Sequence, residues 1–121
     1  MGKLADDTVI DGALNIVATA VEIYVNTAEP ANRAAAISDS LIPVHVMASG
    51  DFTNANGDVN GRKCTVAAQS SLTADATGTA THITLCTGAL MLYVTTCTSQ
   101  AITSGNTVNI GAFDIEIADP T

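Results

Sequence analysis

Alternation of apolar and polar residues recurs along the chain and predicts a mainly β fold. Residues 80–120 hold the longest run of this alternation and the fewest charges. Segments rich in Gly, Asn, Asp, Ser or Thr, above all residues 50–61 and 70–78, are typical of loops. Between such segments, strands are predicted over residues 22–26, 41–47, 63–68, 81–86, 90–96 and 107–118. We expect an antiparallel β-sandwich or barrel-like domain with one N-terminal α-helix.

An amphipathic segment near the N-terminus predicts that helix over residues 9–20. Asp6-Asp7-Thr8 offers an N-cap, and carboxylates are favourable near a helix N-terminus. Residues 1–8 are also interpreted as a polar, flexible or clamping arm. Residues 32–37 could add one or two further helical turns. The apolar residues expected on the buried face of the first helix recur at spacings of three and four: Val9, Ala13, Ile16, Val17 and Ala20.

Two strands carry expectations about their faces. In residues 41–47, Ile42, Val44 and Val46 share one face, and His45 and Met47 share the other. The last strand changes phase, since its first apolar pair and its last three apolar residues differ in parity. A bulge near Gly111-Ala112 would reconcile the halves, as would burial of both faces of residues 107–112. The change of parity also suggests one strand that serves two apolar environments by crossing between sheets: Val108 and Ile110 first, then Phe113, Ile115 and Ile117.

Length and composition narrow the class of protein. The 121 residues predict a single domain with a core of Ala, Val, Ile and Leu, because 47% of the chain is hydrophobic but only 3% is aromatic. A formal net charge of −8 disfavours nucleic acid as a partner, since phosphate binding needs clustered Lys and Arg. No signal peptide and no membrane-spanning run is recognised, so synthesis in a reducing cytoplasm is expected.

The three cysteines are expected to be small buried hydrophobes in the core. Cys64, Cys86 and Cys97 are odd in number and lack a Cys-x-x-Cys spacing, which favours neither a zinc site nor a complete set of disulfides. One disulfide with a free thiol left over is the alternative.

One loop resembles the beginning of a calcium-binding loop. Residues 56–61 (NGDVNG) place oxygen ligands at alternate positions and a Gly at the sixth. The twelfth position, which should supply a bidentate Glu, is Ala67. Turn chemistry explains the same residues, so no metal is predicted.

No catalytic pattern is recognised. His45 and His82 have no nucleophile motif beside them, and exposed or interfacial imidazoles are expected. Asp114 and Glu116 share one strand face, where a solvated position explains them better than a glycosidase pair does. We therefore predict no enzyme activity, no catalytic, cofactor-binding or metal-binding residue, and no cofactor.

Several segments, in order, resemble a group of small virion proteins of tailed bacteriophages. They cover nearly the whole chain and are structural, so they carry over no functional residue. The segments are 13–18 (ALNIVA), 22–25 (EIYV), 28–30 (AEP), 50–53 (GDFT), 61–66 (GRKCTV), 92–96 (LYVTT) and 112–117 (AFDIEI).

The resemblance implies a non-enzymatic capsid decoration or cement protein. Such a protein would bind the major capsid protein on the outer capsid surface as a homotrimer and clamp neighbouring subunits, without contacting nucleic acid or membrane. It would be made in the host bacterial cytoplasm. A tail or head–tail connector component is the alternative, and a receptor- or carbohydrate-binding β module ranks below both.

Overall fold

A computed structural model describes residues 5–120. Its elements follow the chain in this order: α1 (Asp7–Val17), β1 (Glu22–Asn26), α2 (Arg33–Ser38), β2 (His45–Val46), a 3₁₀ turn η1 (Ser49–Asp51), β3 (Phe52–Asn56), β4 (Arg62–Val66), β5 (Gln69–Thr73), β6 (Gly78–Cys86), β7 (Met91–Ile102), β8 (Thr107–Ile110) and β9 (Phe113–Ile117). The fold is mainly β, as predicted, with one main helix at the N-terminal end.

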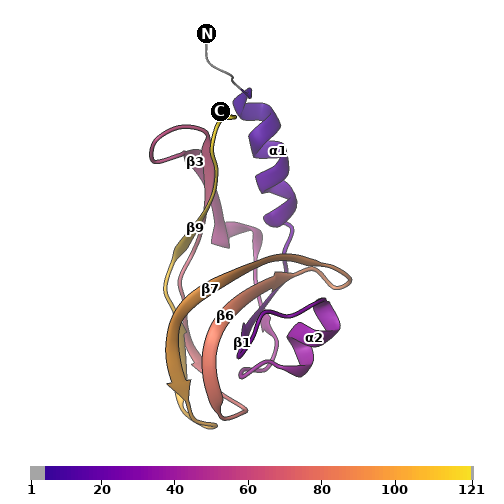
Figure 1. Cartoon of the computed structure of the whole chain (residues 1–121), viewed down its shortest axis with the longest axis vertical. Coiled ribbons are helices and arrows are strands. Elements are labelled where there is room, and N and C mark those ends of the chain that lie inside the picture. Colours follow the sequence, from indigo (N-terminus) through magenta and orange to yellow (C-terminus); the bar gives the residue numbers. More distant parts are fainter. Residues whose placement is uncertain (1–4, 121) are drawn as a thin grey trace.

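The strands form antiparallel sheets arranged like a sandwich. One sheet has the order β2-β1-β6-β7, a second has β3-β4-β9, and a third pairs β5 with β8. In Figure 1, β6 and β7 curve side by side across the lower half of the molecule, whereas β3 and β9 extend upward next to α1. Among the described residues no sheet closes on itself, which decides the predicted alternative in favour of a sandwich over a barrel.

One continuous apolar core joins these sheets to α1. Ile23 of β1, Leu85 of β6 and Val66 of β4 are fully buried in it, together with Leu14 of α1. The opposite face of β1 and β6 is covered by α2, where Tyr24, Ala36 and Cys86 form a second, smaller cluster. Both faces of this part of the sheet are therefore packed.

The predicted helix is confirmed with shifted ends, but its predicted buried face is wrong at Val9, Ala13 and Ile16; Val17 packs against the core, and Ala20, just after the helix, is buried. Ile10 and Leu14 are buried, whereas Val9 and Ile16 are 68% and 61% exposed. The buried pair and the exposed residues both recur at helical spacing, so the sequence pattern alone could not show which of the two faces the core. Leu14 packs into the core, which leaves Val9, Ala13 and Ile16 on the outside.

Polar contacts fix the orientation of α1. Asp6 is the N-cap, and its Oδ1 accepts a hydrogen bond from the Thr8 N–H over 2.8 Å. Asp11 pairs with Arg62 of β4, with 2.9 Å between Nε and Oδ1. Of the expected arm, residues 1–4 lie outside the described residues, whereas Asp7 and Thr8 already belong to α1.

The strand predicted over residues 41–47 is mostly absent. Only His45 and Val46 form β2, and of the three residues expected to share one face, Ile42 is buried whereas Val44 and Val46 are exposed. Pro43 lacks an N–H for a ladder, and the irregular backbone around it breaks the period of two. Consequently Met47, which was expected on the face opposite Ile42, is buried, and Val44 and Val46 are exposed.

Two strands lie where loops were predicted. β3 falls within residues 50–61 and pairs with β4 along its whole length, and β5, which begins at Gln69, covers the start of residues 70–78 and pairs with β8. The Asn and Ala residues of β3 have weak strand preference, and the Ser residues of β5 are typical of turns, so pairing with a neighbouring strand decides their conformation. Ser71 in β5 has φ 62°, where the register with β8 is irregular.

The phase change in the last predicted strand marks a passage between two sheets instead of a bulge within one strand. The chain leaves β8, paired with β5, at Ile110, and enters β9, paired with β4, at Phe113. Val108 and Ile110 are buried on one side of the break, and Ile115 is buried on the other. Each half thus keeps its own apolar face.

Candidate interaction surface

The loop that resembles a calcium site uses its side-chain oxygens for hydrogen bonds within the chain. Asn56 Oδ1 accepts from Arg62 Nη1 over 2.8 Å, and Asp58 Oδ1 lies 2.7 Å from Lys63 Nζ. Asn60 Oδ1 accepts from the Asp119 N–H over 2.9 Å. These contacts close the turn between β3 and β4 and attach it to the chain after β9.

Asp114 and Glu116 point away from the core, as predicted, but each also has partners. Asp114 accepts from Thr65 Oγ1 over 2.7 Å and lies 3.3 Å from Lys63 Nζ. The Thr65 hydrogen bond, followed by Lys63, lowers the pKa of Asp114. Glu116 accepts from the Asp58 N–H over 2.9 Å. The two carboxylates therefore brace β9 against β4 and its turn.

The two imidazoles lie apart, and each has a neutral hydrogen-bond partner. His45 Nε2 lies 2.8 Å from Gln69 Oε1, and His82 Nδ1 lies 2.8 Å from the hydroxyl of Thr81. Both rings are half-buried. Over residues 5–120, no three His, Cys, Asp or Glu side chains gather in a way that could hold a metal ion.

All three cysteines are free thiols. Cys64 and Cys86 are buried, as predicted, and Cys97 is half-buried. Burial raises the pKa of each thiol, so these groups are poorer nucleophiles than an exposed cysteine. Within residues 5–120, no helix has the length and hydropathy needed to cross a membrane.

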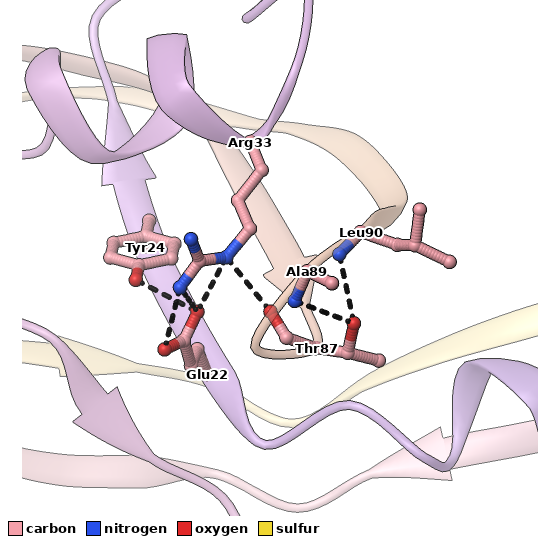
Figure 2. Close-up of polar contacts among 6 residues, drawn as sticks. All are labelled: Glu22, Tyr24, Arg33, Thr87, Ala89 and Leu90. Atoms are coloured by element: carbon pink, nitrogen blue, oxygen red, sulfur yellow. Dashed lines mark hydrogen bonds and ion pairs between the residues drawn. The ribbon is translucent and has the colours of Figure 1, made fainter.

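A candidate site of a different kind lies at the end of the sheet beside α2. At its centre, Arg33 of α2 forms a two-pronged ion pair with Glu22 of β1, with Nη2 lying 2.9 Å from Oε1 and 3.1 Å from Oε2 (Figure 2). Arg33 Nε also donates to the Thr87 carbonyl over 2.9 Å. One guanidinium thus connects α2, β1 and the turn between β6 and β7.

Electrostatic contacts hold this centre in one arrangement. The Tyr24 hydroxyl donates to Glu22 Oε1 over 3.0 Å. Burial, aided by that carboxylate, raises the pKa of Tyr24 to about 12. The hydrogen bonds that Arg33 donates to Glu22 likewise raise the pKa of Arg33. The pair is only partly open to solvent, with 27% of the Arg33 side chain and 16% of the Glu22 side chain exposed.

The turn between β6 and β7 presents an apolar side chain from this fixed base. Thr87 Oγ1 accepts from the N–H groups of Ala89 and Leu90, over 3.2 and 2.9 Å, and the Thr87 N–H donates to the Leu90 carbonyl. Figure 2 shows the Leu90 side chain pointing away from the ion pair. Leu90 is 62% exposed although the backbone around it is hydrogen-bonded.

Further exposed apolar side chains lie on the elements that carry this ion pair. Val46 lies directly opposite Glu22 across the β1–β2 pair and is exposed. Ile37 follows Arg33 by one turn of α2 and is also exposed. We name the set formed by Glu22, Arg33, Ile37, Val46 and Leu90 the Arg33 surface. An arginine held by an ion pair, with exposed aliphatic side chains on the neighbouring elements, suits a contact with another protein.

Sequence reasoning missed this surface. Glu22 and Tyr24 share a parity on a predicted strand, but eleven residues separate Glu22 from Arg33 and the pattern does not pair them. The one signal in the sequence was the scarcity of basic residues: the chain has only 4 Lys and Arg residues, and Arg33 is one of them. Within residues 5–120 each of these cations, Arg33, Arg62 and Lys63, forms an ion pair.

No protein-family model, curated protein or solved structure matches this chain.

Proposed function

We propose that this protein is a non-enzymatic virion protein of a tailed bacteriophage, which decorates the capsid. It binds the outer capsid surface and stabilises contacts between major capsid subunits. The proposal includes synthesis in the host bacterial cytoplasm and threefold association on the particle. Two lines of support are the resemblance of the sequence segments to small phage virion proteins and the character of the Arg33 surface.

The observation that carries the proposal is the fixed, exposed position of Leu90. An exposed leucine on a mobile loop would lose conformational entropy on binding. Here the Thr87 hydrogen bonds and the Arg33–Thr87 contact hold the turn before any partner arrives. A preorganised apolar side chain beside an arginine favours attachment to a protein surface.

Binding to several subunits at once would strengthen such a contact. Each small surface contributes modest affinity, but copies held together by association bind with avidity. A capsid offers many identical sites at fixed spacing. The proposed mechanism therefore needs the rigid fold and its contact surface, and it needs no chemistry.

Cryo-electron microscopy of purified particles that contain the protein tests this function. The expected result is density that fits the sandwich and α1, repeated across the capsid faces in many copies. Density confined to the tail or to the portal vertex would contradict decoration and support a tail or connector component. A receptor- or carbohydrate-binding module would instead show glycan binding by the isolated protein.

A further inference from the structure

The longest strand, β7, forms one edge of the four-stranded sheet. Within the described residues it pairs with β6 and with no other strand. In that same range, the only side-chain hydrogen bonds to its backbone come from its own Thr95 and Gln100. An edge strand presents a row of unpaired N–H and carbonyl groups, which can pair with another chain.

The usual protection against edge pairing is missing from β7. Its sequence, MLYVTTCTSQAI, contains no Lys, Arg, Asp, Glu or Pro. At two other edges protection is present: β2 has only two residues, and β9 carries Asp114 and Glu116. The remaining edge strands, β3, β5 and β8, also lack charges and proline, but each has only four or five residues against twelve in β7. Charges and shortness are two of the devices that keep edge strands apart, so β7 stands out as open to pairing.

The distribution of charge favours a second copy of this chain as the partner. Between Asp75 and Asp114 the sequence has no Asp, Glu, Lys or Arg, although the chain as a whole has a net charge of −8. This neutral stretch includes β6, β7 and β8. Two copies that meet along β7 therefore bring no like charges together on the paired strands, and a charged partner would find no complementary group there.

We propose that two copies of the protein associate by antiparallel pairing of their β7 strands across a twofold axis. The pairing uses the first half of the strand, Met91 to Thr96, where the register with β6 is irregular only at Leu92, whereas residues 97–99 bulge opposite Thr81 and interrupt the register more widely. Its β-branched and aromatic residues, Val94, Thr95, Thr96 and Tyr93, form favourable cross-strand pairs. The result is one continuous sheet through both subunits.

This contact goes beyond the proposed function and does not depend on it. A twofold pair of β7 strands closes as a dimer and belongs to the free protein. It leaves β2, at the opposite edge of the sheet, available for contacts on a particle. A protein that does not dimerise could therefore still decorate a capsid, and a protein that does not bind capsids could still dimerise.

Light scattering coupled to size exclusion, over a range of protein concentrations, tests the pairing. The wild-type protein is expected to become dimeric as concentration rises. Thr96→Lys places a charge on the exposed face of the paired segment and is expected to weaken dimerisation by at least about tenfold. Thr79→Lys adds the same charge at an exposed site on β6, outside the proposed contact, and should dimerise like the wild type.

Hydrogen exchange gives a second measurement that needs no variant. Backbone amides of residues 91–96 should become more protected at high protein concentration, while those of the β3–β4 turn should not change. A protein that stays monomeric at all concentrations overturns the proposal. So does self-association that Thr96→Lys leaves unchanged, or concentration-dependent protection that spares β7.

Discussion

Thr84 Oγ1 donates a 2.7 Å hydrogen bond to Asn26 Oδ1, and both side chains are fully buried. Asn26 Nδ2 donates in turn to the Ala36 carbonyl over 2.8 Å. The two bonds join β6, β1 and α2 through one amide. They hold α2, and with it Arg33, over the end of the sheet where the Arg33 surface lies.

Replacement of Thr84 by Val should reveal how much this bond contributes. The change keeps the shape of the side chain and leaves Asn26 Oδ1 buried without its donor. The free energy of unfolding in urea should fall by about 1–3 kcal/mol. Thr79→Val, at an exposed site on the same strand, should change it by less than about 0.5 kcal/mol. Equal losses in the two variants would show that the buried bond has no special weight.

Tyr24 should make the protein less stable at alkaline pH. Burial raises its pKa from 10.0 to about 12, so in this range the folded state keeps a proton that the unfolded state releases. Stability is therefore complete below pH 10 and falls as pH rises towards 12, by at most about 3 kcal/mol. The raised thiol pKa values add a loss that Tyr24→Phe shares, so the difference between the two unfolding profiles isolates Tyr24. Parallel profiles would contradict the assignment.

Gly61 closes the turn between β3 and β4 in a conformation that requires glycine. Its φ is +70°, and an added Cβ would lie 2.1 Å from the Ile117 carbonyl oxygen. Gly61→Ala should cost at least about 3 kcal/mol of unfolding free energy, because strain and a backbone clash add together. Gly105 also has a positive φ, but a Cβ added there would meet open space, so Gly105→Ala should lower the free energy of unfolding by only about 1–2 kcal/mol. Thermal unfolding of both variants separates clash from strain.

Parts of the fold could be predicted because their pattern is local. Residues 22–26 and 81–86 alternate strongly, and both lie within strands of the central sheet. The face of α1 could not be predicted, since two stripes of equal spacing competed and packing on β4 chose the one with Leu14. β3 and β5 were missed because partner strands, not their own residues, make them strands.

The candidate surface was beyond the reach of the sequence for a similar reason. Its central ion pair connects a strand to a helix after a proline-containing turn, and the position of Leu90 depends on a hydrogen-bonded turn far along the chain. Tertiary packing creates both features. The sequence did indicate the passage between sheets near Gly111, because a change of parity is visible without any structure.

Occupancy of capsids by a Leu90→Asp variant tests the central claim most directly. Val59→Asp is the matched control, because Val59 is also apolar, is 91% exposed and lies in the β3–β4 turn, away from the Arg33 surface. Both variants should fold like the wild type by circular dichroism. Leu90→Asp should bind particles that lack the protein at least about tenfold more weakly than the wild type does, whereas Val59→Asp should bind like the wild type. Equal binding of the wild type and both variants would contradict attachment through the Arg33 surface.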